Sequence, residues 1–226
     1  MKSPLLLASI IFFAPLALVA ETKPAATQTV IPAAQLTEGL KSGLGAIISQ
    51  ALGEGKLSVT PPPALAKLQT ALSKTDKAET ASGFSDALAA TVAKLSPQMS
   101  SLLQTSVKDL SVADASSVLG GGTDAATQFL KKSAAPALRE KLLPLVKQAT
   151  ASTGLATKAK DMLALAGPLA GFGGSKAVSD LDGYVCDQVI AQSFALMSKQ
   201  EAAVRANPAL LSSNPLAQKA FALFKK

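Results

Sequence analysis

Apolar residues recur at helical spacing along most of the chain, and this pattern limits the fold more than any other feature. Between Leu36 and Ala51, apolar side chains follow one another at intervals of three and four residues, which places them on one face of an α-helix. Most of the apolar residues are Ala and Leu, and no Trp is present. Small, unbranched side chains have high helix propensity. The sequence therefore predicts an all-α protein, a single-domain multi-helix bundle with short Gly/Pro-rich connections.

The length and composition suit one folded domain with short additions before it. Of the 226 residues, 48% are hydrophobic and 16% are charged, which is typical of a chain that forms a core and not of a disordered one. Residues 21–34 contain Pro and small polar residues and are expected to be a flexible spacer. Residues 35–226 are expected to form the helical domain.

Residues 1–20 have the pattern of a cleaved export signal. Lys2 supplies a positive charge, an apolar stretch of about fifteen residues runs from Leu5 to Val19, and Ala20 precedes a polar segment. Such a stretch is shorter than the ~20 residues that span a bilayer. No Cys stands directly after it to carry a lipid anchor. We therefore expect cleavage near Ala20 and a periplasmic location within a Gram-negative envelope.

Prolines and glycines divide the rest of the chain into expected helices. Pro97 and Pro136 suit a first helical turn, so a new helix is expected at each, and Pro144 should kink the second. Residues 163–179 are expected to form a loop over the core, or alternatively a flap over a cavity or a membrane-touching tip. Further helices are expected over residues 64–73, 78–95, 97–110, 111–119, 123–130, 156–165, 181–206 and 216–224. Ser111 with Asp114 resembles a capping box at the start of the helix over 111–119, and Thr123 is expected to cap the helix that follows.

The segment from Ser111 to Ala149 carries the most distinctive motif. It contains Asp114-Ala115, Leu119-Gly120-Gly121 and Ala125-Ala126-Thr127. This motif resembles the signature of domain-of-unknown-function family 4197, a bacterial family of exported helical proteins without an assigned function. The resemblance extends over residues 36–224 and recurs at Glu201 and at Arg205 to Pro208. It implies the same fold and location, and it brings no catalytic residues with it.

The turn from Gly120 to Thr127 is the best candidate for a ligand contact. A Gly-rich turn that leads into a helix exposes backbone N–H groups and the positive end of the helix dipole, which favours an anion. The turn lacks the Lys-Ser/Thr ending of a Walker motif, and Asp124 would repel a phosphate. The alternative is a tight turn between packed helices. The candidate ligand or signature positions are Asp114, Gly120, Gly121, Thr123, Asp124, Thr127, Glu201 and Arg205.

Several catalytic chemistries are excluded by composition. The chain has no His, so a Ser-His-Asp or Cys-His arrangement cannot form. No closely spaced acidic cluster suggests a metal cage. We therefore expect no catalytic residue, no cofactor and no metal. Cys186 is the single cysteine and is expected to be a buried apolar residue, the alternatives being an intermolecular disulfide or a reactive thiol.

The positive charges are spread along the chain. The formal net charge is +7, and loss of residues 1–20, which contain Lys2 and no acid, lowers it to +6. The longest basic runs are pairs, without the aromatic residues that stack on bases, so no nucleic-acid partner is expected. We predict a non-enzymatic binding or envelope-scaffold protein. Its expected partner is an unknown envelope protein or a lipid, and peripheral contact with the membrane is compatible with this prediction. The alternatives are a carrier of a lipid or other hydrophobic ligand in an apolar helical cavity, and an enzyme that uses carboxylates alone.

Overall fold

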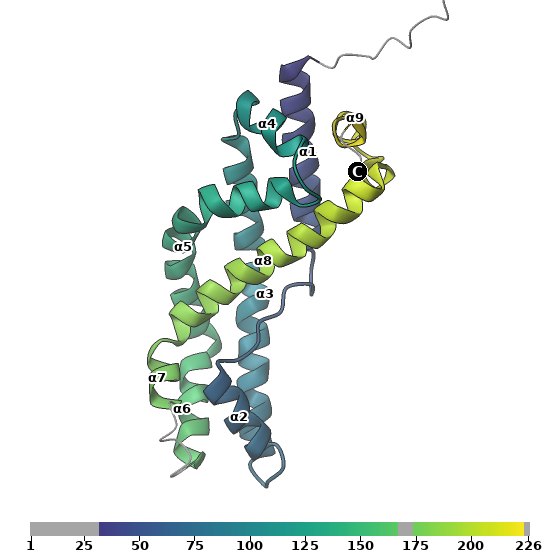
Figure 1. Cartoon of the computed structure of the whole chain (residues 1–226). Coiled ribbons are helices and arrows are strands. Elements are labelled where there is room, and N and C mark those ends of the chain that lie inside the picture. The colour runs from purple at the N-terminus through teal and green to yellow at the C-terminus, as the bar shows by residue number, and fades with distance from the viewer. Residues whose placement is uncertain (1–31, 167–173, 224–226) are drawn as a thin grey trace, which may run out of the picture. The chain divides into compact units, whose positions relative to one another are not determined.

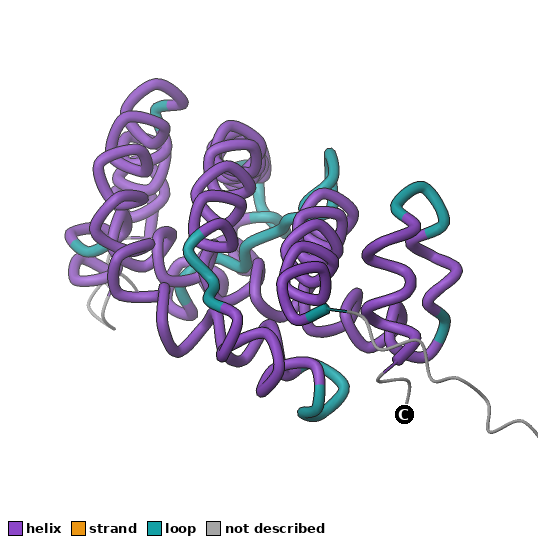
Figure 2. The backbone as a smooth tube through the Cα atoms, turned by 90° about the horizontal axis from the view of Figure 1, so that it is seen from above, coloured by secondary structure: helices purple, strands orange, loops and turns teal. Residues whose placement is uncertain are grey.

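Every regular element of the described residues is a helix. The computed structural model describes residues 32–166 and 174–223, and no strand occurs among them. The prediction of an all-α, multi-helix fold is confirmed, as Figure 2 shows. The elements are α1 (Ala33–Ala51), α2 (Pro63–Leu72), α3 (Ala78–Lys108), α4 (Val112–Leu119), α5 (Ala125–Thr153), α6 (Leu155–Ala166), α7 (Gly174–Ser179), α8 (Leu181–Ala206), the 3-10 helix η2 (Pro208–Leu211) and α9 (Pro215–Leu223).

The long helices α3, α5 and α8 pack on one another and form the centre of the domain. Helix α8 crosses α3 obliquely, and α5 contacts both of them (Figure 1). One half of α3 contacts α1, while α2 and α6 pack against the other half. Helix α9 packs across α1, and α4 packs between α1 and the start of α5.

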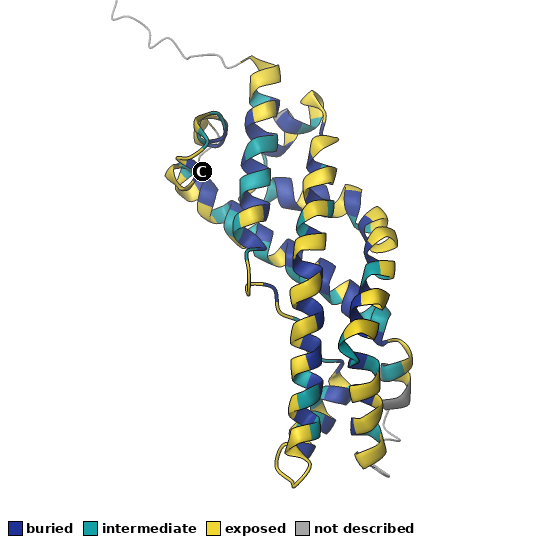
Figure 3. Ribbon diagram, turned by 180° about the vertical axis from the view of Figure 1, so that it is seen from behind, coloured by how far each residue is buried: buried dark blue, intermediate teal, exposed yellow. Residues whose placement is uncertain are grey.

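The apolar faces that the sequence pattern predicts are the faces that become buried. In α1, the side chains of Leu40, Leu44, Ile47 and Ile48 are fully buried. Figure 3 shows the same separation in each long helix, with buried residues on the inner side and exposed residues on the outer side. Burial of a Leu or Ile side chain contributes about 1.5–3 kcal/mol, so these faces hold the helices together.

The helix starts predicted at Pro97 and Pro136 are wrong. Helix α3 continues through Pro97, and α5 continues through Pro136 and Pro144. An interior proline costs about 3 kcal/mol through a lost hydrogen bond and a clash. In α3, Leu95 and Met99 on either side of the proline are both buried, and this continued burial offsets the penalty. Helix α5 instead bends along its length (Figure 1), as helices with interior prolines do.

The remaining boundaries agree more closely with the sequence pattern. Helix α8 has the predicted bounds, but Asp180 before it makes no side-chain capping bond. The predicted spacer is wrong at its end, because Ala33 and Ala34 belong to α1. The predicted export signal and the rest of the spacer lie outside the described residues.

The predicted loop over residues 163–179 is also partly wrong. Helix α6 continues to Ala166 and α7 begins at Gly174, and the residues between them lie outside the described part. Apolar residues such as Met162, which is fully buried, keep this end of α6 against the core.

Within residues 32–166 and 174–223, no helix has both the length and the hydropathy needed to cross a membrane.

Two glycines allow α9 to lie very close to α1. A Cβ atom built on Gly43 would stand 2.5 Å from Cε2 of the Phe221 ring, and one on Gly39 would stand 2.8 Å from Cβ of Ala220. Both distances are far below normal van der Waals contact. The absence of a side chain at these two positions therefore sets the position of α9 and of Phe221.

Candidate functional site

Two charged side chains are buried side by side in α8. Glu201 is 0% exposed and Arg205, one turn later, is 2% exposed. Arg205 Nη2 lies 2.9 Å from Glu201 Oε1, and Arg205 Nε donates a hydrogen bond of 2.9 Å to the same oxygen. Removal of either partner would leave an unpaired buried charge, which costs several kcal/mol.

The Glu201 carboxylate caps the N-terminus of α5. Its Oε1 accepts a 3.0 Å hydrogen bond from the backbone N–H of Ala126, and its Oε2 accepts 2.8 Å bonds from the N–H and the hydroxyl of Thr127. The first N–H groups of a helix have no partner within it and favour a negative charge. The anion at this N-terminus is therefore a carboxylate of the protein itself.

The Arg205 guanidinium closes the C-terminal end of α4. Its Nη1 donates to the carbonyl oxygen of Leu119 and its Nη2 to that of Val118, each at 3.0 Å. The guanidinium carbon lies 5.7 Å from the centre of the Phe221 ring, within the range of a cation–π interaction. We name Glu201, Arg205, Thr127 and the backbone groups they bind the Glu201 cluster; it joins α4, α5 and α8, and Phe221 adds α9.

Asp124 lies at the edge of the Glu201 cluster. Its Oδ2 accepts hydrogen bonds from Gln128 Nε2 at 2.8 Å and Ser198 Oγ at 3.0 Å. The bond from Gln128 is the main reason that the pKa of Asp124 is lowered. Asp124 thus stabilises the junction of α5 and α8.

The other predicted positions do not join the cluster. Asp114 forms the predicted capping box of α4, accepting at Oδ2 a 3.0 Å bond from the Ser111 N–H while its own N–H donates 3.3 Å to Ser111 Oγ. Gly120 and Thr123 are exposed. The expectation that Thr123 caps the next helix is wrong, because the N-cap residue is Asp124 and Glu201 binds the free N–H groups.

The Glu201 cluster offers no free group to an external ligand. Gly121 is needed for a close turn, since a Cβ there would stand 2.5 Å from Cβ of Ala125. Among the residues that the structure describes, no buried side-chain nitrogen or oxygen lacks a hydrogen-bond partner. The geometry therefore favours the interpretation of this turn as a tight junction between helices.

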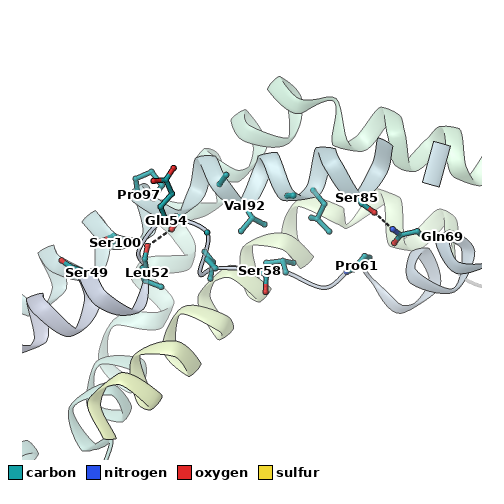
Figure 4. A pocket seen from close by; sticks show the side chains of 17 residues that line it. Ser49, Leu52, Glu54, Ser58, Pro61, Gln69, Ser85, Val92, Pro97 and Ser100 are labelled. Atoms are coloured by element: carbon teal, nitrogen blue, oxygen red, sulfur yellow. Dashed lines mark hydrogen bonds between the residues drawn. The ribbon is translucent and has the colours of Figure 1, made fainter. Parts of the chain in front are cut away.

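A groove of about 900 Å³ lies elsewhere, between α3 and the segment that joins α1 to α2 (Figure 4). We call this segment, residues 52–62, the connector. From α3, the groove is lined by Ser85, Leu88, Ala89, Val92, Ala93, Ser96, Pro97 and Ser100. From the connector and its neighbours, it is lined by Ser49, Leu52, Glu54, Gly55, Leu57, Ser58, Val59, Pro61 and Gln69.

Side chains fix the connector at both ends of this groove. Ser96 Oγ of α3 donates a 3.1 Å hydrogen bond to the carbonyl oxygen of Leu52 (Figure 4). At the other end, the Tyr184 hydroxyl of α8 lies 3.1 Å from the carbonyl oxygen of Thr60 and 3.2 Å from that of Pro61. The groove thus has two walls held in place by neighbouring helices, which is typical of a preformed binding site.

The lining of the groove carries little charge. Glu54 is the one charged residue among those that line it, and the other lining side chains are apolar, amide or hydroxyl-bearing. Within the described part of the chain, no group of three or more Cys, Asp or Glu side chains is placed to hold a metal ion. Nothing in the groove therefore pairs an acid with a base.

Cys186 does not line the groove, and its thiol faces the carbonyl oxygen of Arg139 at 3.9 Å. Its side chain is 0% exposed, and burial raises the pKa of its thiol to about 11. The thiolate is the nucleophilic form, so the folded protein has neither a reactive thiol nor one that could bridge two chains.

A family model described as "Protein of unknown function (DUF4197)" matches residues 33–222. The chain belongs to this family. No curated protein and no solved structure matches it. In this DUF4197 protein, the two segments that carry the family resemblance, 111–149 and 201–208, meet at the Glu201 cluster.

The sequence contains no clear signal for the groove. A stripe of small and hydroxyl-bearing residues runs along α3 at helical spacing, including Ser85, Ala89, Ser96 and Ser100. This stripe could have indicated a shallow helix face. The apolar residues beside it, however, have the same spacing as residues that pack into a core. Only the position of the connector shows that this face of α3 lines a groove.

Proposed function

We propose that this DUF4197 protein is an exported, non-enzymatic binding protein of the periplasm, and that the groove between α3 and the connector is its binding site. The observation that carries the proposal is the groove itself. Its volume of about 900 Å³ lies within the range of about 300–1,000 Å³ that is typical of ligand sites. The apolar lining favours a ligand, or part of a partner, with apolar groups.

A non-enzymatic role is supported by the positions of the charged groups. General acid–base catalysis needs a titratable group within reach of the substrate. Glu201 and Arg205 are buried and fully bonded to the protein, and Glu54 stands alone in the groove lining. Export is supported by the positive charge of Lys2 and the apolar stretch 5–19 that follows it.

The second candidate function is a carrier of a lipid or other hydrophobic molecule. The apolar floor formed by Leu88 and Val92 favours it. The same groove offers no Lys or Arg side chain to an anionic headgroup or a fatty-acid carboxylate. For this reason the groove supports a binding protein better than a carrier of anionic lipid.

Two adjacent alanines of α3 provide a matched test of the groove. Ala89 and Ala90 are both exposed, but only Ala89 lines the groove. The neutral fluorescent probe N-phenyl-1-naphthylamine is titrated into the wild-type protein, Ala89→Arg and Ala90→Arg. We expect saturable binding to the wild type and Ala90→Arg, and affinity weaker by about tenfold or more in Ala89→Arg. Equal affinity for all three proteins would exclude the groove as the site.

Export has its own test. The full chain is expressed in a Gram-negative host, the periplasm is separated, and the mass of the protein is measured. We expect the protein in the periplasmic fraction, with a mass that corresponds to cleavage near Ala20. Recovery of the uncleaved chain from the cytosol would contradict this part of the proposal.

A further inference from the structure

We infer that the groove binds an extended peptide segment of a partner protein, with a basic residue or a free amino terminus of that segment beside Glu54. The inference rests on the proposed function and specifies the ligand of the same groove. Three features of the groove support it: its length, the unpaired backbone of the connector, and its charge.

The length of the groove fits a short strand. Its floor on α3 extends from Ser85 to Ser100, which corresponds to roughly 22 Å at a rise of about 1.5 Å per residue. An extended chain rises about 3.3 Å per residue. A peptide of about six or seven residues would therefore fill the floor.

The connector presents backbone groups that can pair with such a peptide. Between Leu57 and Thr60 it is neither helix nor strand. Within the described part of the chain, no backbone partner is found for the N–H groups of residues 57–60 or for the carbonyls of residues 57–59. An extended segment with unpaired N–H and C=O groups is a template for addition of another strand.

Burial alternates along the connector as it does along a half-buried strand. Leu57 is buried and Val59 is half-buried, while Ser58 and Thr60 are exposed. Side chains of a strand point alternately to its two faces, so the backbone hydrogen-bonding groups of residues 57–60 are directed sideways. A second strand would lie beside the connector and over the floor that Leu88 and Val92 provide.

The charge of the groove favours a peptide with a basic group over an anionic lipid. Glu54 is exposed and lines the groove. Lys56, the nearest cation in the sequence, does not line it and donates through Nζ to the carbonyl oxygen of Gln50 at 2.6 Å. An anionic headgroup would therefore meet only a like charge, whereas a basic side chain or an amino terminus would meet an opposite one.

The test begins with peptides selected from a phage-displayed random library on the mature wild-type protein. The selected sequences should have apolar residues at alternate positions and a basic residue or the free amino terminus at one end. The selected peptide, made synthetically, should bind with 1:1 stoichiometry in calorimetry. Affinity should fall about tenfold or more in Ala89→Arg and stay unchanged in Ala90→Arg; circular dichroism confirms that both variants are folded.

Backbone pairing is tested with two modified forms of the same peptide. One is N-methylated at its odd-numbered nitrogens and the other at its even-numbered nitrogens. Because alternate N–H groups of a strand point to opposite edges, one form should lose affinity by about tenfold or more and the other should keep it. Glu54→Gln should also weaken binding, with a smaller effect at high salt.

The outcomes separate this inference from the proposed function. If no peptide is selected, if Ala89→Arg has no effect, or if both methylated forms bind equally, the peptide inference is wrong. Binding of N-phenyl-1-naphthylamine that Ala89→Arg alone weakens would then leave the groove as the site of another ligand. A lipid recovered in stoichiometric amount from the purified protein would also overturn the inference and favour the carrier. If the wild-type protein binds neither a peptide nor the probe, the inference and the proposed function are both wrong.

Discussion

Replacement of Glu201 by Gln should destabilise the protein more than any surface substitution of the same kind. The carboxylate is fully buried and accepts hydrogen bonds from Ala126, Thr127 and Arg205. Gln keeps the size of the side chain but removes the charge and one acceptor oxygen, which leaves the Arg205 guanidinium without its counter-ion. Breaking a buried ion pair costs about 3–5 kcal/mol. For a domain of this size, such a loss lowers Tm by roughly 6–20 °C.

Glu140→Gln is the matched control for this substitution. Glu140 lies on α5 and is exposed, so its replacement should change stability by no more than about 0.5 kcal/mol. Both variants are measured by urea denaturation followed by circular dichroism. A cost below about 1 kcal/mol for Glu201→Gln would contradict the structural role assigned to the cluster. The double variant with Arg205→Met should lose less than the sum of the single losses, because the two residues interact directly.

Three further predictions concern the rest of the domain. Gly43→Ala should cost about 1–3 kcal/mol in urea denaturation because its Cβ would meet the ring of α9, whereas Gly45→Ala, with nothing within 4 Å, should be neutral or stabilising; equal effects would contradict the packing of α1 on α9. The Ser111 hydroxyl lowers the pKa of Asp114 from 3.8, so the stability from this group is present above pH 3.8 and is lost as pH falls through the lowered value. Asp114→Asn should reduce the slope of the free energy of unfolding against pH in that range, and an unchanged slope would refute this. Cys186 should resist iodoacetamide in the folded protein and react after unfolding, as mass spectrometry would show; rapid modification of the native protein would contradict its burial.

Local sequence features were sufficient to predict most helices. The apolar face of residues 36–51, the capping box at Ser111 and the bounds of the helix over 181–206 all appear in the structure. The helix starts predicted at Pro97 and Pro136 are wrong because burial on both sides of a proline can offset its local penalty of about 3 kcal/mol. Pro97, for instance, lies between the buried Leu95 and Met99.

The candidate site depended on contacts that no local pattern contains. The sequence indicated that the turn before Ala126 would attract an anion, and the structure places a carboxylate there. That carboxylate belongs to Glu201, 75 residues later in the chain, so its identity follows only from the packing of α8 on α5. In the same way, the groove exists because Ser96 and Tyr184 position the connector over α3.

NMR distinguishes the groove from the Gly120–Thr127 turn as the binding site. Backbone amide shifts of the mature protein are followed while N-phenyl-1-naphthylamine is added. If the groove is the binding site, the largest shifts occur in the connector and in α3 between Ser85 and Ser100, and the amide signals of Ala126 and Thr127 do not shift. Largest shifts at Ala126 and Thr127, with an unperturbed connector, would show that the turn and not the groove binds the probe.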